Sequence, residues 1–236
     1  MKRLFTNIAK AAIASVCSLA LLVSTTAAAS NNLATGFSTL EKGASVIVMA
    51  PDIELFSMSA GGVLEPKADW TTAAQRYVSE SLRAHFSKIS LNPKFQSEEQ
   101  ADDFSDLSSL HAAVARSISF HHFGGQKLPT KSGVLDWSMG DVTREIQSES
   151  GARYGLFLWI RDSYASNERK AAMIAFALLG VGLAGGTQVG YASLVDLSDG
   201  KILWFNQIQR AMGDLRERSA ASETVSELLK NFPISN

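Results

Sequence analysis

The stretch from Arg169 to Arg210, R-K-A-A-M-I-A-F-A-L-L-G-V-G-L-A-G-G-T-Q-V-G-Y-A-S-L-V-D-L-S-D-G-K-I-L-W-F-N-Q-I-Q-R, decides the fold of this chain. Its second half contains two β-rich runs, residues 189–197 and 202–210, which residues 198–201 (Ser-Asp-Gly-Lys) join. An Asp-Gly pair between two such runs is the strongest short-range signal of a β-hairpin, because both central turn residues adopt positive φ. We therefore predict an antiparallel hairpin late in the chain.

Two further apolar runs predict strands outside this stretch. Residues 44–50 are short and β-branched and stop at Pro51, so we expect a buried strand there, which residues 52–58 either extend or pair back on. Residues 154–160 are continuously apolar, which is typical of a strand that is buried on both faces.

Helices are predicted where apolar residues recur at i, i+3 and i+4 between capping signals. The expected helices are residues 70–87 after Asp69 as N-cap, a helix from Ser97 with Gln100 completing a capping box, residues 139–150 between Ser138 and Gly151, and residues 220–231. The element order predicts one α/β domain, residues 44–236, with a mixed β-sheet and a late antiparallel hairpin packed against several helices. Residues 30–43 are polar and small, and we expect a flexible lead-in.

The N-terminus has the features of an export signal. Lys2, Arg3 and Lys10 precede and flank an apolar run, and small residues lead up to Ala29, so we predict a signal peptide over residues 1–29 and a periplasmic protein. An uncleaved anchor helix is disfavoured because the apolar run is shorter than the ~20 residues that span a bilayer. Lipid attachment at Cys17 and association with the outer membrane are left open.

Charge and cysteine content exclude several functions for the cleaved chain. Cys17 is the single cysteine, so cleavage removes disulfides, thiol nucleophiles and cysteine-ligated metal centres from consideration. Loss of three basic residues from 22 leaves 19 against 23 acidic residues, a net charge of 19 − 23 = −4. Nucleic acid is therefore not an expected partner, because its binding requires a basic excess.

The apolar segment, residues 171–186, contains neither a charge nor a side-chain hydrogen-bonding group. As a helix it would extend about 24 Å, short of a ~30 Å hydrocarbon core, and its four glycines weaken the second half. Three interpretations follow: a buried helix and loop in the domain core, which is favoured, a contact with a membrane surface or partner, and a spanning hairpin of two strands.

No motif in the chain identifies an enzyme or a cofactor. Residues 180–185 match G-x-G-x-x-G, but a strand-like run follows where a dinucleotide site needs the N-terminus of a helix, so we expect no cofactor. The four histidines, His85, His111, His121 and His122, lie within 38 residues. On one helix His111 and His121 would be about 15 Å apart, too far to share a metal ion, so we expect no metal site. A Ser/His/Asp arrangement remains open because geometry defines it, not chain order.

Three stretches together resemble the CsgG-like (curli-secretion-channel) family of envelope proteins. They are residues 45–51 (Ser-Val-Ile-Val-Met-Ala-Pro), residues 190–204 (Gly-Tyr-Ala-Ser-Leu-Val-Asp-Leu-Ser-Asp-Gly-Lys-Ile-Leu-Trp) and residues 213–216 (Gly-Asp-Leu-Arg) before a helix that ends at Phe232-Pro233. The chain departs from the pore-forming members, because it lacks a convincing lipobox and their second long insertion.

The resemblance implies a non-enzymatic, exported protein that assembles or supports a secretion or envelope complex as a homo-oligomer. The membrane surface or an envelope protein would then be contacted by the apolar residues Ile174, Phe176, Leu178, Val181 and Leu183. Trp159 and Trp204 belong to the core in this hypothesis. The alternative is a soluble periplasmic hydrolase or small-ligand-binding protein whose site lies near residues 111–122.

Overall fold

The computed structural model describes residues 32–89, 91–211 and 213–235. The predicted signal peptide and Cys17 lie outside the described residues. The described residues belong to one compact unit.

Within the described residues, seven strands form one mixed sheet. They are β1 (Val46–Val48), β2 (Asp52–Met58), β3 (Leu64–Pro66), β4 (Lys94–Phe95), β5 (Tyr154–Ala165), β6 (Gln188–Asp196) and β7 (Ile202–Arg210). β5 is central: β1 and β2 follow each other along one of its edges, both parallel to it, and β6 runs antiparallel along the other. The two segments on either side of Pro51 thus continue along the same neighbour, so residues 52–58 extend the first strand's path.

Six α-helices and three shorter helical segments accompany the sheet in the described part of the chain. The α-helices are α1 (Ala68–Phe86), α2 (Glu98–Asp103), α3 (Ser105–Ile118), α4 (Arg144–Ser150), α5 (Asn167–Ala177) and α6 (Arg218–Leu228). A π-helical turn, η1 (Ser119–Phe123), continues α3, and the 3₁₀ turns η2 (Pro129–Lys131) and η3 (Asp141–Thr143) lie between α3 and α4.

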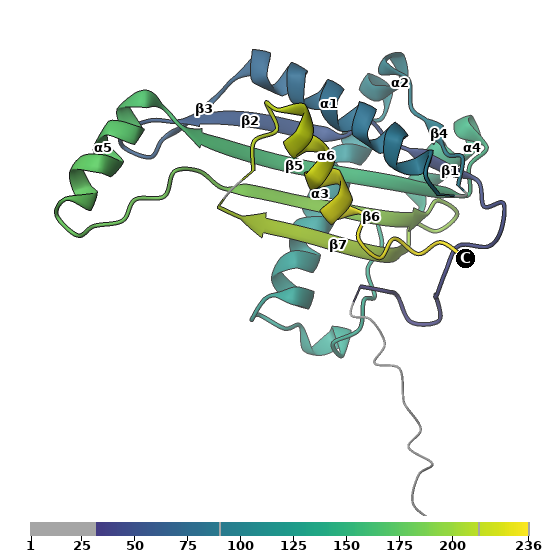
Figure 1. The fold of residues 1–236 in the computed structure, drawn as a ribbon. Helices are drawn as coiled ribbons and strands as arrows, with labels where there is room; N and C mark the ends of the chain where they lie inside the picture. Colours follow the sequence, from purple (N-terminus) through teal and green to yellow (C-terminus); the bar gives the residue numbers. More distant parts are fainter. Residues whose placement is uncertain (1–31, 90, 212, 236) are drawn as a thin grey trace, which may run out of the picture. The chain divides into compact units, whose positions relative to one another are not determined.

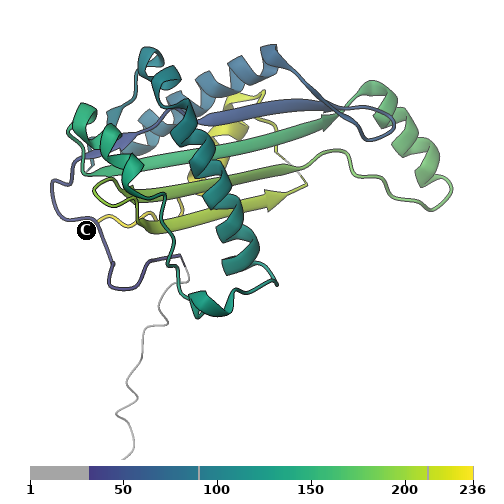
Figure 2. The same ribbon diagram turned by 180° about the vertical axis from the view of Figure 1, so that it is seen from behind.

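The helices pack on both faces of the sheet, as Figures 1 and 2 show. α1 and α6 cover one face, where Val78, Leu82 and Val225 pack against strand residues such as Leu156 and Leu194. α3 crosses the opposite face, and its packed residues there are Leu107, Ala115 and Ile118, together with Ile146 of α4 and the strand residues Phe157 and Phe205. Alternate strand side chains therefore enter two cores, which confirms the predicted α/β sandwich and explains why residues 154–160 carry no polar face.

Helices occur in each predicted region of the chain, but several of them begin or end at other residues than predicted. The capping box of Ser97 and Gln100 is present, and Gly151 adopts φ +65° after α4. Asp69 is not the N-cap of α1, because the helix already begins at Ala68 with Lys67 as the flanking residue. The helix expected from Ser97 divides at Phe104 into α2 and α3, and α3 carries the buried residues Leu107, His111, Ala115 and Ile118.

The hairpin forms as predicted, with a different turn. The connection spans residues 197–201, in which Gly200 has φ +72° and Asp199 does not have positive φ. Gly200 N–H donates to the Asp196 carbonyl, and Asp196 N–H donates to the Lys201 carbonyl. The Asp199 carboxylate accepts a hydrogen bond from Lys201 N–H. Because β6 ends at Asp196 and β7 begins at Ile202, the loop is longer than the two-residue turn that the Asp-Gly pair predicted.

The apolar segment is not part of the core. Residues 166–187, which we call the arm, leave β5, form α5 and return to β6 beyond the end of the sheet (Figure 1). The described residues of α5 include no buried side chain. The core interpretation of residues 171–186 is therefore wrong, because the sheet ends before the arm begins and both cores are filled by other helices. The spanning-hairpin interpretation requires two strands, whereas the first part of this segment, up to Ala177, is helical. Trp159 and Trp204 are buried, as predicted.

Truncation of two isoleucines measures the difference between core and arm. Ile160 is fully buried, and Ile160→Ala should lower the free energy of unfolding by about 2–5 kcal/mol. Ile174 is 68 % exposed, and Ile174→Ala should change it by less than about 0.5 kcal/mol. Urea unfolding of both variants makes the comparison. A large loss for Ile174→Ala would mean that the arm is packed as core.

Candidate interaction surface

The arm begins with a well-defined helix start. Ser166 is the N-cap of α5, and its hydroxyl accepts a hydrogen bond from Arg169 N–H at 3.2 Å. Glu168 in the first turn has a favourable position relative to the helix dipole. The helix closes after Leu178, and Gly180, with φ +77°, turns the chain back toward the sheet.

Large apolar side chains of the arm face solvent. Five of them are strongly exposed: Ile174 (68 %), Phe176 (45 %), Leu178 (85 %), Leu179 (78 %) and Val181 (47 %). Leu183 is half-buried. The five contact residues predicted from sequence thus lie on one arm, and the exposed Leu179, which was not among them, lies there too.

The root of the arm is tied to the sheet by backbone hydrogen bonds. Ala165 N–H donates to the Gly185 carbonyl at 2.7 Å, and Ser163 N–H donates to the Thr187 carbonyl at 3.1 Å. Gly186 is required here, because a Cβ at this position would lie 2.0 Å from the Ser163 carbonyl oxygen. The two strands of the arm's root therefore continue the β5–β6 pairing, and the apolar tip starts only beyond it.

Arg169 joins the arm to a second, distant segment. Its Nε and Nη2 donate to the Ala184 carbonyl, at 3.2 and 3.1 Å, and its Nη1 donates to the Ala60 carbonyl at 3.0 Å. Ala60 lies in the β2–β3 turn. Val63 at the end of this turn and Leu64 at the start of β3 are 65 % and 47 % exposed. The fold thereby places two exposed apolar segments, more than a hundred residues apart in the chain, at the same end of the sheet.

Beneath the root lies a buried polar network that sequence analysis did not find. Asp162, at the end of β5, is buried and accepts hydrogen bonds from the Tyr164 hydroxyl and from Gln188 Nε2, the latter at 2.7 Å. Leu215 N–H donates to the Tyr164 hydroxyl oxygen at 2.7 Å. Arg210 Nε donates to Gln188 Oε1 at 2.8 Å. Through Tyr164 and Gln188, the Asp162 carboxylate is thus linked to β6, to β7 and to residues 213–216.

The remaining arginine contacts close the network against α6. Arg210 Nη2 donates to the Thr224 hydroxyl and Nη1 to the Glu223 carboxylate, each at 2.7 Å. Gly213 lies so close to Gln188 that a Cβ would be 2.6 Å from Nε2. A side chain at this position would therefore displace the Gln188 side chain from its hydrogen bonds. A polar run, Arg161 to Tyr164, follows the apolar part of β5. This run was the feature of the sequence that could have indicated the buried polar network.

The adjacent residues Arg161 and Asp162 do not form an ion pair with each other. Strand geometry points them to opposite faces, and Arg161 instead pairs with Asp52 at 2.7 Å and Glu54 at 3.3 Å. Desolvation by burial raises the pKa of Asp162 above its ordinary value, and the hydrogen bonds from Tyr164 and Gln188 counter part of that effect. Asp214 and Arg216 do pair, at 2.7 Å, and hydrogen bonding by Arg216 lowers the pKa of Asp214.

The histidines do not converge on a common centre. His111 is buried, stacks on Phe157 and shares a 2.8 Å hydrogen bond through Nε2 with the buried Ser193 hydroxyl. His121 bonds the Gln126 carbonyl through Nδ1. His122 is buried beside Phe123. His111 therefore serves as a packed core residue, and its contact with Ser193 lies beneath α3, closed to a substrate.

Other candidate sites are limited within the described residues. A cleft of about 690 Å³ lies between α1 and the β1–α2 side of the sheet, with Arg76, Arg83 and Gln96 on its walls, and none of the four histidines lines it. Across the residues the structure describes, no three His, Cys, Asp or Glu side chains gather where a metal ion could be held. Every helix in that part of the chain is too short or too polar to cross a membrane.

Comparison with known proteins yields structural similarity without a family. No protein-family model matches the sequence, and no curated protein matches it. Among solved structures, the PelC dodecamer from Paraburkholderia phytofirmans has a TM-score of 0.42 and 14 % identity, over 86 % of this chain and 96 % of PelC. A lipoprotein from Neisseria meningitidis has a TM-score of 0.30 and 13 % identity, over 70 % of this chain and 81 % of its own. The C-terminal domain of LpoB from Salmonella enterica has a TM-score of 0.28 and 14 % identity, over 75 % of this chain and 87 % of the LpoB domain. Such low identities and TM-scores carry no argument about function.

Removal of the buried carboxylate tests the network at the root. Asp162→Ala leaves the Tyr164 hydroxyl and the Gln188 amide without their acceptor and should lower the free energy of unfolding by about 2–4 kcal/mol. Asp162→Asn keeps an acceptor oxygen of similar shape and should lower it by less. Denaturant unfolding of both variants provides the measurement. Equal losses would show that hydrogen bonding by the carboxylate does not hold the root.

The buried histidine predicts a pH dependence of stability. Burial lowers the pKa of His111 from 6.5 to about 3. Between these values the unfolded chain binds a proton that the folded chain does not, so His111 should lower the free energy of unfolding by up to about 1.4 kcal/mol per pH unit as pH falls. His111→Gln should flatten the curve of unfolding free energy against pH in this window. His121→Gln is the matched control and should retain the wild-type slope.

Proposed function

We propose that the protein is an exported, non-enzymatic component of the cell envelope that assembles or supports an envelope complex through its apolar arm. The observation that carries this proposal is the exposure of Ile174, Phe176, Leu178, Leu179 and Val181 on one ordered arm. Contiguous exposed apolar surface of this kind is typical of sites that contact another protein or a membrane. The arm is therefore the functional surface of this proposal.

The way the arm is held supports the same function. Arg169 and the backbone bonds at Ala165 and Ser163 fix the root, so the tip is presented in a defined direction. A binding surface that is held in position loses less conformational entropy on association than a flexible loop does. Membership of the CsgG-like group, a homo-oligomeric state and a periplasmic location at the outer membrane complete the proposal.

Charge substitutions in the arm test this function. The full chain, with its own N-terminal segment, is produced in a Gram-negative host and followed by cell fractionation and by light scattering of the purified protein. The wild type should fractionate with the envelope and have a native mass that is a multiple of the chain mass. Phe176→Asp combined with Leu178→Asp should move at least tenfold more protein into the soluble periplasmic fraction, because each carboxylate would have to be desolvated at the contact.

A matched control separates this effect from a general effect of added charge. Phe120 and Val142 are also exposed, at 56 % and 52 %, and lie outside the arm. Phe120→Asp combined with Val142→Asp should fractionate as the wild type does. If the arm variant and the control behaved alike, or if the wild type were a monomer in the soluble fraction, the arm would not be a contact surface.

A further inference from the structure

We infer that the counterpart of the arm is a lipid bilayer, and that residues 174–181, the arm tip, enter the apolar layer of one leaflet as an interfacial anchor. This inference rests on the proposed function and names the partner of the same surface. It follows from how the apolar side chains are distributed around the arm, from where the charges lie and from the length of the arm.

The arm tip is exposed on all sides. Ile174, Ala175, Phe176 and Ala177 are four consecutive exposed residues, and four residues complete more than one helical turn of ~3.6 residues. A helix that binds in a groove of a partner protein presents a single apolar stripe at i, i+3, i+4 and i+7. A helix that is apolar around its whole circumference fits surroundings that are apolar in every direction. Lipid supplies such surroundings.

Charged groups are confined to the root of the arm. Glu168, Arg169 and Lys170 precede Ala171, and the next charged residue along the chain is Asp196. From Lys170 to Leu179 a helical rise of about 1.5 Å per residue gives about 14 Å, which is close to half of a ~30 Å hydrocarbon core. The tip is thus long enough to reach into one leaflet while the charged root stays at the headgroups.

The backbone at the turn of the arm is suited to an apolar layer. Leu179 N–H and Val181 N–H both donate to the Phe176 carbonyl, and Gly180 N–H donates to the Ala177 carbonyl. Backbone groups without partners are costly in hydrocarbon, where no water is present to bond them. The closure of the helix end by its own amides therefore removes part of the cost of insertion.

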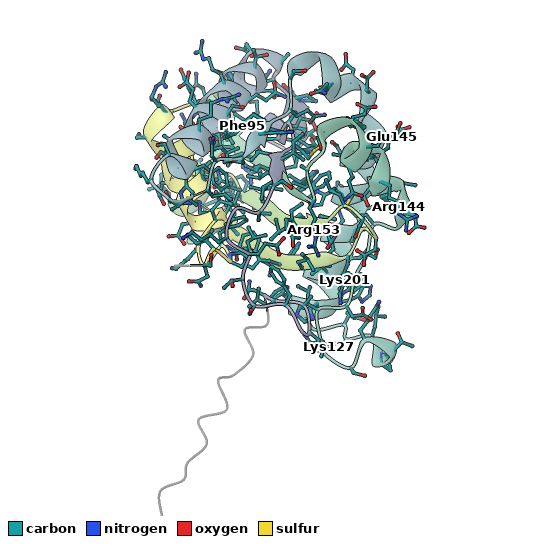
Figure 3. All side chains as sticks on the ribbon, turned by 90° about the vertical axis from the view of Figure 1, so that its right-hand side faces the viewer. Phe95, Lys127, Arg144, Glu145, Arg153 and Lys201 are labelled. Atoms are coloured by element: carbon teal, nitrogen blue, oxygen red, sulfur yellow. The ribbon has the colours of Figure 1, made fainter. Side chains whose placement is uncertain are left out.

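The two ends of the sheet differ in polarity, which sets an orientation. Val63 of the β2–β3 turn and Leu64 at the start of β3 add exposed apolar surface at the arm's end of the sheet. The end viewed in Figure 3, away from the arm, carries the charged side chains of Lys127, Arg144, Glu145, Arg153 and Lys201. With the arm in the bilayer, this charged end remains in water.

Vesicle flotation tests the inference directly. The exported wild-type protein is mixed with vesicles of phosphatidylcholine, or of phosphatidylcholine with phosphatidylglycerol, at low and at high salt. Because the tip is uncharged, binding should occur to both compositions and should persist at high salt. Leu178→Asp should weaken binding about a hundredfold or more, as expected for a carboxylate in place of leucine within hydrocarbon. Val142→Asp should bind as the wild type does.

Depth is measured with a dye that reports the polarity of its surroundings. Cleavage after Ala29 leaves a chain without cysteine, so Leu178→Cys and Val142→Cys can each be labelled at a single position. Unmodified wild type, treated with the same dye, measures any labelling of a retained Cys17. Emission from position 178 should shift to the blue on addition of vesicles, and emission from position 142 should not.

The outcomes separate this inference from the proposed function. Binding that required phosphatidylglycerol and was lost at high salt would overturn insertion, as would a missing shift at position 178. If the arm variants disrupted envelope fractionation while the wild type bound no vesicles, the counterpart would be a protein or a second copy, and only the lipid inference would fail. If envelope fractionation too were unaffected, the proposed function would fail as well.

Discussion

The structure depends on the pairing of β5 along both of its edges. This twelve-residue strand bonds β1 and β2 on one side and β6 on the other, and almost all of its side chains are buried. Each of its backbone amides and carbonyls in these ladders is satisfied in a region without water, where an unpaired group would be costly. The two cores form because successive β5 side chains enter opposite faces, toward α1 and α6 or toward α3.

The same strand explains why the arm lies outside. Asp162 near the end of β5 needs partners when it is buried, and Gln188 at the start of β6 is one of them. That bond, with the Ser163–Thr187 backbone contact, brings the departing and returning chains together. The residues between them form an excursion beyond the sheet. Since the cores are already filled from other helices, the apolar side chains of the excursion have no interior to enter.

Particular residues show which features could be predicted from sequence. The β-branched run before Pro51 and the apolar run from Tyr154 became strands because burial and β-propensity agree there. The capping box at Ser97 was recognisable because all of its partners lie within four residues. Asp69 was misassigned as a cap because an aspartate is favourable both at the N-cap and inside the first turn of a helix, where the dipole stabilises its negative charge. The partners of Asp162 could not be predicted, because Gln188, Leu215 and Tyr164 are set by strand register and not by spacing.

By itself, the sequence determined the α/β class, the hairpin, the two buried tryptophans and the concentration of uncharged apolar residues between positions 171 and 186. These features depend on local periodicity and on composition, which a linear pattern records. Whether that segment was core or surface was decided only by the tertiary structure, because a helix with alanine, leucine and phenylalanine suits either environment. The outcome depended on how much apolar surface the other helices had already covered, and on the Arg169 and Asp162 contacts that hold the arm's root at the end of the sheet.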